Sequence, residues 1–199
     1  MHARKQHAMN LLISILVLVL LAGCAQTEHS GFRFGLASAP ITLDPRFATD
    51  AASTRVNRLL YQRLVEFDES MQPVPGIANW QRLTPKHYRF VLINDVMFHN
   101  QNNLDMYDVE ATYESVLKPE IGSPHRASLD VIESMEIMDG KTLDFHLNRV
   151  DLMFPGRLVI GILPKEQLAA EHAFNRQPIG SGPFQFSVWP ESGKLVLKR

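Results

Sequence analysis

The residues that could do chemistry in this sequence are its histidines, one glycine-serine turn and a few paired carboxylates. None of the eight histidines is three or four residues from another, so a zinc site would have to be assembled by the fold alone. Gly180–Gly182 lacks the glycine that a nucleophile elbow needs two residues before its serine. Asp105 with Asp108, and Glu133 with Glu136, lie at an expected helix start and on an expected exposed strand. We therefore expect no catalytic residues, no metal and no cofactor, and a binding protein rather than an enzyme.

The single cysteine, Cys24, lies where an apolar run gives way to polar residues. The positive residues 1–7 precede Leu11–Ala22, a run shorter than the about 20 residues of a membrane span, so residues 1–23 are predicted to be a signal peptide. Leu21–Cys24 resembles a bacterial lipobox, in which the cysteine becomes the first mature residue and carries lipid. We expect Cys24 to be lipidated and to hold the chain at a membrane. The alternative is a soluble secreted protein with an incidental cysteine.

The composition allows a normal hydrophobic core and argues against a nucleic-acid partner. Apolar residues make up 45% of the chain, which is ordinary for a globular protein. The formal net charge is −1, and loss of Arg4 and Lys5 with the signal peptide would make the mature chain more acidic. No basic surface for DNA or RNA is therefore expected. With one cysteine there is no internal disulfide, so burial alone must stabilise the fold.

Hydrophobic periodicity predicts a mixed α/β fold. Strands are predicted at 32–36, 88–92, 132–137, 142–147, 184–188 and 195–197, and helices at 50–65, 106–118 and 165–172. In the first helix Val56, Leu59, Leu60 and Leu64 are assigned to the buried face. Residues 67–75 are predicted to form a polar connection. Asp139-Gly140 predicts a type I′ hairpin turn, in which a β-branched residue at Gly140 would be strained.

Several stretches, taken in order, resemble the peptide- and nickel-type solute-binding proteins of ABC importers, the bacterial extracellular solute-binding family 5. These stretches are Leu43–Pro45, Leu60–Val65, Pro73–Trp80, Tyr88–Leu92, Phe98-His99, Asp108-Val109 and Pro178–Phe184. Asn100-Gln101 departs from the family's usual Asp-Gly, and family members are longer and have two lobes. The resemblance implies a periplasmic binding protein-like II fold, with part of lobe I, its small inserted subdomain and no second lobe. It divides the chain into the start of lobe I (24–66), the small subdomain with its return connection (67–176), and a truncated return to lobe I (177–199).

The resemblance also implies which residues face a ligand cleft: Thr49, Asp50 and Ala51 in the turn after Leu43–Pro45, and Ser38 before it. The alternative is that these residues only make a loop and a helix cap, since Asp50 is a suitable N-cap without any ligand.

By resemblance, the protein is a lipid-anchored component of the periplasm or cell envelope. It would bind an oligopeptide or a similar small solute and deliver it to the permease subunits of an ABC transporter. The alternative is a truncated lipoprotein without a transport role, which acts as a sensor or binds a protein partner. Peptide binding would favour the first function.

Overall fold

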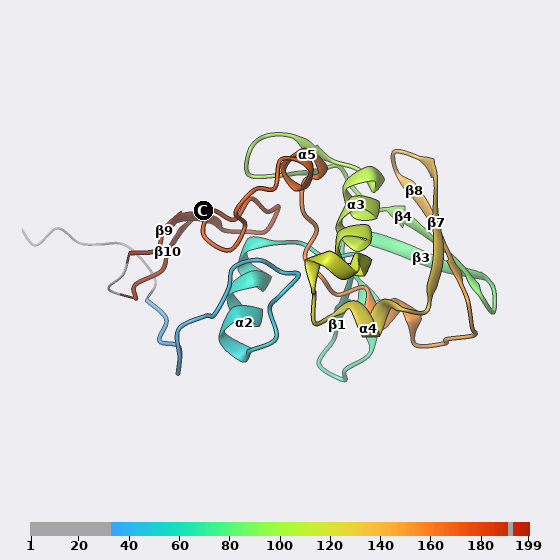
Figure 1. Ribbon diagram of the computed structural model, residues 1–199, viewed down its shortest axis with the longest axis horizontal. Helices are drawn as coiled ribbons and strands as arrows, with labels where there is room; N and C mark the ends of the chain where they lie inside the picture. The colour runs from blue at the N-terminus through green and yellow to red at the C-terminus, as the bar shows by residue number, and fades with distance from the viewer. Residues whose placement is uncertain (1–32, 191–192) are drawn as a thin grey trace, which may run out of the picture. The chain divides into compact units, whose positions relative to one another are not determined.

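The computed structural model describes residues 33–190 and 193–199. Every helix and strand of this part belongs to one compact unit, residues 36–199 (Figure 1). The helices are α2 (Ala51–Leu60), α3 (Met106–Leu117), α4 (Arg126–Leu129) and α5 (Lys165–Ala169), with 3₁₀ turns η2 (Pro119–Ile121) and η3 (Phe154–Arg157). The strands are β1 (Val65–Phe67), β2 (Pro73–Pro75), β3 (Ala78–Thr84), β4 (His87–Leu92), β5 (Val96–Met97), β6 (Asn103–Leu104), β7 (Ile132–Asp139), β8 (Thr142–Leu147), β9 (Gln185–Val188) and β10 (Val196–Lys198). None of the helices in these described ranges is long and apolar enough to cross a membrane.

The largest sheet is antiparallel and has the strand order β3-β4-β8-β7 (Figure 1). On β4 the side chains of Tyr88, Phe90 and Leu92 are buried, while the residues between them are more exposed. The register places Phe90 opposite Trp80 on β3 and Leu143 on β8. Because side chains alternate along a strand, one face of the sheet is apolar and the other polar. The strand predicted here is confirmed.

Helix α3 packs against the apolar face of this sheet. A capping box closes its N-terminus: Asp105 Oδ1 accepts a hydrogen bond from the amide of Asp108 at 3.3 Å, and Asp108 Oδ2 accepts one from the amide of Asp105 at 2.9 Å. Val109, Tyr113 and Val116 are completely buried. Their spacing places them on one side of the helix, as the sequence predicts.

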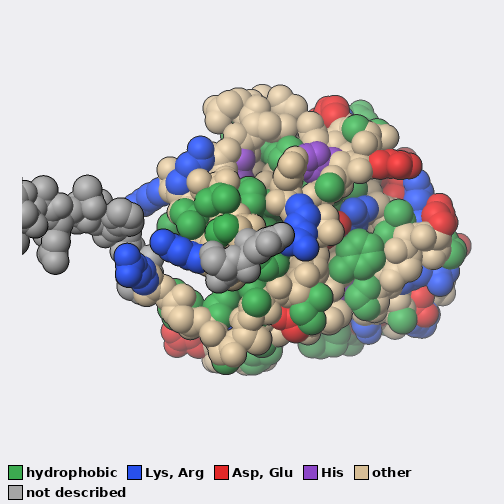
Figure 2. All heavy atoms as spheres, turned by 60° about the vertical axis from the view of Figure 1, so that its left-hand side comes forward, with side chains coloured by type: hydrophobic (Ala, Val, Ile, Leu, Met, Phe, Trp, Pro, Cys, Tyr) green, Lys and Arg blue, Asp and Glu red, His purple; other side chains and the backbone are tan. Residues whose placement is uncertain are grey.

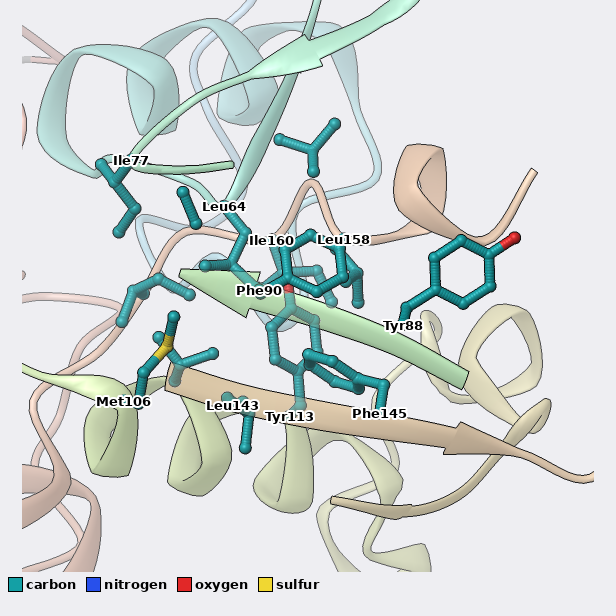
Figure 3. Close-up of a cluster of buried hydrophobic side chains, with 14 of the residues drawn as sticks. Leu64, Ile77, Tyr88, Phe90, Met106, Tyr113, Leu143, Phe145, Leu158 and Ile160 are labelled. Carbon is teal, nitrogen blue, oxygen red and sulfur yellow. The ribbon is translucent and has the colours of Figure 1, made fainter. Parts of the chain in front are cut away.

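Aromatic side chains fill the space between the sheet and α3. Figure 3 shows Phe90, Tyr113 and Phe145 between β4, β8 and the helix. The ring centroids of Phe90 and Phe145 are 5.4 Å apart, and those of Tyr113 and Phe145 are 6.0 Å apart, both in edge-to-face geometry. Such pairs contribute beyond simple burial, so this cluster fixes the helix on the sheet.

Helix α2 is shorter than the sequence predicts. It begins directly after its N-cap Asp50, as expected, but ends at Leu60, five residues early. Tyr61 already has an extended backbone, with φ −128° and ψ 141°. The next residues pair with other segments, since the carbonyl of Arg63 accepts a hydrogen bond from the amide of Ile77 at 2.9 Å. A continued helix would use this carbonyl internally, so the long-range pairing ends the helix.

The buried face of α2 also differs from the prediction. Leu59, which was assigned to that face, is 40% exposed. Val56 and Leu60 are buried as predicted, and two polar residues, Ser53 and Asn57, complete the buried face. The buried positions are thus spaced by three or four residues, as in any amphipathic helix, but two of them are polar.

Two other segments differ from the sequence-based prediction. Residues 67–75, predicted as a connection, include most of an antiparallel strand pair in which Val65 lies opposite Pro75 and Phe67 opposite Pro73. The prolines are tolerated because a strand at an edge need not donate all its amides. The predicted strand at 32–36 is absent over residues 33–36, where nothing in the described part pairs with the backbone, and residue 32 lies outside the described residues.

The β7–β8 hairpin forms where the sequence predicts it, but with a different turn. Asp139 pairs with Thr142, so the two turn residues are Gly140 and Lys141, and neither has a positive φ. Asp139 Oδ1 accepts a hydrogen bond from the amide of Lys141 at 2.8 Å. This bond from a side chain to the backbone stabilises the turn without a positive φ. A Cβ at Gly140 would meet no atom within 4 Å. The type I′ prediction, with its strain at Gly140, is therefore wrong.

Near its C-terminus the chain forms the two predicted closing strands. Strands β9 and β10 pair antiparallel, and Leu197 lies opposite Phe186. Both side chains pack against a second apolar cluster beside α2, formed by Leu43, Val56, Leu60, Tyr61, Leu163 and Phe174.

Candidate functional site

A pocket of about 530 Å³ lies between α2 and two segments from later in the chain. Its lining comprises Pro45, Ala48 and Thr49 before α2, Thr54 and Asn57 on α2, Arg63 after it, His125 and Ser128 at α4, and Gly156, Arg157 and residues 159–161 at and after η3. No aspartate or glutamate is among these residues, so its charged and titratable side chains are all basic.

The backbone around Arg63 holds the two sides of the pocket together. Arg63 pairs with Gly161 in an isolated antiparallel bridge, and the amide of Ile162 donates to the carbonyl of Gln62 at 3.0 Å. On the other side, the amide of Ile77 donates to the carbonyl of Arg63. Residue 63 is therefore fixed on both sides, which leaves its side chain little choice of direction.

The turn before α2 is tied down by buried polar groups. Asp44 accepts hydrogen bonds from Arg46, with Nη2 2.7 Å from Oδ2, and the hydroxyl of Tyr61 donates to the carbonyl of Leu43 at 3.0 Å. The hydroxyl of Ser123 donates to the carbonyl of Arg46 at 2.7 Å and so links this turn to the segment that carries His125. These contacts fix the turn that carries Pro45, Ala48 and Thr49, three of the residues that line the pocket.

The structure brings one of the predicted cleft residues, Thr49, into the pocket lining. Asp50 lies beside it but caps α2, with Oδ1 accepting a hydrogen bond from the amide of Ser53 at 2.8 Å. Burial alone would raise the pKa of Asp50, but hydrogen bonds from Ser53 and from the backbone of Asp50 and Ala52 together outweigh it and lower the pKa below its ordinary value. Ala51 and Ser38 are exposed and do not line the pocket. The predicted lipidation site, Cys24, lies outside the described residues.

Of the pocket residues, sequence reasoning found only Thr49, and Asn57 and Arg63 are among those that it missed. Asn57 is 3% exposed, and the side chain of Arg63 is 12% exposed. A signal for Asn57 exists in the sequence, since it follows Ser53 by four residues and precedes Leu60 by three, on the inner side of α2. A polar residue on an apolar helix face requires a partner or a ligand.

The titratable groups of the pocket favour an electropositive interior. Burial lowers the pKa of His125 below its ordinary value, and a contact with the backbone of Ala48 opposes the shift only in part, so this imidazole is neutral near pH 7. Arg157 is paired with Asp151, with Nε 2.6 Å from Oδ2. Burial lowers the pKa of Arg63, with Glu66 acting in the opposite sense, yet a guanidinium remains charged.

Chemically, this arrangement can bind a solute but contains no reactive pair. The hydroxyl of Ser128 donates to the backbone carbonyl of His125 rather than to its imidazole, so it is not activated as a nucleophile. Among the described residues, no three His, Cys, Asp or Glu side chains are arranged to hold a metal ion. On the face shown in Figure 2, basic, acidic and apolar side chains are interspersed.

Comparisons with known proteins agree with this picture of a binding domain. The oligopeptide-binding protein AppA of Bacillus subtilis is 25% identical over the whole of this chain and 41% of its own length. Its structure in complex with a nonapeptide matches with a TM-score of 0.74 and 28% identity, over 79% of this chain and 34% of AppA. NikZ of Campylobacter jejuni, solved in complex with Ni(L-His), matches with a TM-score of 0.68 and 28% identity, over 80% of this chain and 32% of NikZ.

A transcriptional regulator is also similar to this chain. The HTH-type transcriptional regulator SgrR of Escherichia coli K12 is 31% identical over 70% of this chain and 25% of SgrR. The chain thus spans less than half the length of each of these relatives.

The structural neighbours have the periplasmic binding protein type II fold, and this mixed α/β chain covers about a third of the length of each neighbour. The family described as bacterial extracellular solute-binding proteins, family 5 Middle, matches residues 72–199, and the chain belongs to that family.

Proposed function

We propose that this chain is part of an extracytoplasmic solute-binding protein of an ABC importer, and that it binds oligopeptides. The observation that carries the proposal is the family match over residues 72–199, together with the likeness to AppA, which was solved with a nonapeptide. The pocket between α2 and residues 156–161 supplies a concave, largely apolar surface with a few polar groups, of the kind that binds small molecules. Closure over a captured solute would present it to the permease subunits of the transporter.

In this proposal the ligand-facing surface is the pocket and the turn beside it. Thr49 lies in the pocket lining, while Asp50, Ala51 and Ser38 are proposed to contact parts of a solute that extend beyond it. The proposed division is the start of lobe I at 24–66, the small subdomain and return connection at 67–176, and a return to lobe I at 177–199. The sheet of β3, β4, β8 and β7 with α3 lies within the second of these segments.

Peptide binding is tested by NMR titration of the ¹⁵N-labelled chain with di- to pentapeptides. The expected result is that backbone amide signals of the pocket lining, such as those of Thr49 and Gly161, move in a saturable way, while those of β7 do not. NMR detects the weak binding expected of a chain that spans 41% of AppA. If no pocket signal responds to any of these peptides at millimolar concentration, peptide binding by this chain is wrong.

We further propose that lipid on Cys24 anchors the protein in the periplasm or cell envelope. The support is the sequence itself: an apolar run too short to span a bilayer precedes Leu21-Ala22-Gly23-Cys24. Cells that express the chain or its Cys24→Ser variant are fractionated with detergent. The mass of the protein is then measured by mass spectrometry. The variant should move to the aqueous phase and lose the acyl mass. A variant that stays in the detergent phase with unchanged mass would contradict the anchor.

A second candidate is a sensor that reports a solute without transporting it. The similarity to the regulator SgrR over 70% of this chain favours it, since the same domain type occurs there in a transcriptional regulator. Co-purification from membranes distinguishes the two functions. Co-purification with permease subunits supports transport, whereas a membrane-anchored chain that binds a solute or a protein partner without any permease subunit supports the sensor.

A further inference from the structure

Buried polar atoms without partners are concentrated at the pocket. Among the described residues, five buried side-chain atoms have no hydrogen-bond partner, and three of them, Asn57 Oδ1, Asn57 Nδ2 and Arg63 Nε, belong to the pocket lining. A fourth is the hydroxyl of Tyr113, a completely buried side chain on the inner face of α3. Buried polar groups in native proteins almost always have partners, so this cluster points to a bound molecule.

The charge of Arg63 is also poorly compensated. The anionic group nearest to it among the described residues is Glu66, whose Oε2 lies 3.7 Å from Nη1. The same oxygen of Glu66 is 3.1 Å from the guanidinium of Arg58, which therefore competes for it. No carboxylate lines the pocket, and the other arginine there, Arg157, is already paired with Asp151. The pocket thus offers one buried cation whose Nε–H is unused.

Asn57 adds a donor and an acceptor to the lining of the same pocket. Its amide is on the buried face of α2, whereas Arg63 is held by its bridge to Gly161 and its bond to Ile77. The backbone that carries each side chain is therefore fixed, so a ligand that binds them does not have to order a flexible segment.

We propose that Arg63 and Asn57 form a subsite for an anionic oxygen group of the solute, specifically a carboxylate. The inference rests on the proposed function, in that a peptide carries such a group at its C-terminus. The guanidinium of Arg63 and the amide of Asn57, both in the pocket lining, donate to the carboxylate oxygens. Charge-assisted hydrogen bonds of this kind are the strong ones.

The test follows the Nε–Hε NMR signal of Arg63 in the 199-residue chain, which reports on the unused donor directly and requires no variant. Four probes are titrated: trialanine, trialanine amide, sodium acetate and inorganic phosphate. Trialanine and acetate should shift the Arg63 signal, and the amide should leave it in place. Arg63→Met should weaken trialanine binding at least about tenfold, as expected for a lost hydrogen bond to a charged group. Arg55→Met, at an exposed position of α2, should leave trialanine binding unchanged.

A purely structural role for Arg63 makes a different prediction. If Arg63 only stabilises the fold, Arg63→Met lowers the denaturation midpoint and leaves the affinity ratio of trialanine to its amide unchanged, and the subsite is wrong. We expect the midpoint to be nearly unchanged, because the ion pair that would be lost, to Glu66 at 3.7 Å, is long and Glu66 keeps its closer partner Arg58. Asn57→Ala should reduce the same ratio in the same direction.

The probes separate failure of this inference from failure of the proposed function. If trialanine shifts pocket amides but not the Arg63 Nε–Hε signal, the subsite is wrong and peptide binding stands. If acetate shifts that signal while no peptide binds, the subsite stands and the proposed peptide function is wrong. A response to phosphate that is stronger than the response to acetate overturns the carboxylate assignment, and no response to any probe overturns both.

Discussion

Arg63 and Gly161 face each other across an isolated antiparallel bridge, and this pairing joins the chain after α2 to the segment after η3. The two residues are almost a hundred positions apart, yet both line the pocket. Gly161 also lies against Tyr61, since a Cβ built on it would be 2.5 Å from the Cβ of Tyr61. The absence of a side chain at residue 161 is therefore what allows the bridge to form.

Gly161→Ala is expected to destabilise the protein by about 1–3 kcal/mol, the usual range for an overpacked site. The added methyl group would also lie 3.3 Å from the Cβ of Pro45. Tyr61 cannot move aside easily, because it is 1% exposed and its hydroxyl is bonded to the carbonyl of Leu43. Urea denaturation measures the change, and the pocket amide signals of the variant should shift as well.

Gly140→Ala is the matched control for that substitution. Gly140 has no positive φ, and a Cβ there meets no atom within 4 Å. Its effect on the free energy of unfolding should stay within about 0.5 kcal/mol, as for ordinary surface changes. Equal midpoints for the two alanine variants would contradict the close approach of Gly161 to Tyr61.

Asp50→Ala should lower the free energy of unfolding by about 1 kcal/mol, the typical cost of a lost N-cap. The carboxylate accepts the amide hydrogen bond of Ser53, which alanine cannot do. Asp50→Asn keeps an acceptor oxygen and should retain most of the stability at neutral pH. If Asp50→Asn keeps the midpoint but weakens peptide binding, the side chain contacts solute as well as capping α2. A midpoint for Asp50→Ala that equals that of the parent chain would show that the cap is dispensable.

The local parts of this fold could be predicted from the sequence. The capping box of Asp105 and Asp108 and the apolar stripe that contains Tyr113 are both set within one helix, and the structure has them as expected. Strands β4 and β8 likewise follow from alternation of side chains. The hairpin position was also predictable, but its turn type was not, because Asp139 uses its side chain in place of a positive φ.

The rest depends on contacts between distant residues. Leu60 ends α2 because the following backbone pairs with Ile77 and with the segment at Gly161, and nothing within residues 50–65 indicates this. The pocket is assembled from residues around 49, 63, 125 and 160, so no single motif marks it. Asn57 was the one detectable signal, as a polar side chain on the buried face of a helix. Arg63 had none, since its burial depends entirely on the long-range pairing.

Arg89→Met is expected to change how stability depends on pH at the polar face of the sheet. Asp144 is 2% exposed there, and its carboxylate accepts hydrogen bonds from Arg89 at 2.7 and 2.8 Å. The hydrogen bonds from Arg89 are the main reason that the pKa of Asp144 lies below its ordinary value. A lowered pKa in the folded state contributes stability above the ordinary value of 3.8, and this stability is lost as the pH falls through the lower value.

The difference in midpoint between the parent chain and Arg89→Met should therefore be larger at pH 6 than at pH 3. Arg82→Met, at an exposed position on the adjacent strand β3, serves as the control and should show no such change. A difference for Arg89→Met that is the same at both pH values would contradict the role of Arg89 in holding the Asp144 charge.

Asp108 should act on stability in the opposite direction. Burial raises its pKa from 3.8 to about 6, although its oxygens accept the amides of Asp105 and Lys165, both at 2.9 Å. Between about pH 4 and 6 the folded chain therefore holds a proton that the unfolded chain has released. Stability from this group is greatest below pH 4 and falls as the pH rises toward 6, by about 3 kcal/mol for a shift of this size.

Asp108→Asn isolates this contribution, because the amide does not titrate. The variant loses one of the two acceptor oxygens and should be less stable than the parent at every pH. The stability deficit of Asp108→Asn should shrink as the pH rises from 4 to 7, since only the parent loses stability over that window.

Asp50→Asn is the control of opposite sign. The lowered pKa of Asp50 makes its ionised form the stabilising one, so the stability deficit of Asp50→Asn should grow as the pH rises from 3 to 6. Urea midpoints at pH 4, 5, 6 and 7, with an added point at pH 3 for Asp50→Asn, measure both trends. A deficit for Asp108→Asn that is constant or grows with pH would show that this carboxylate is already ionised at pH 4 in the folded protein.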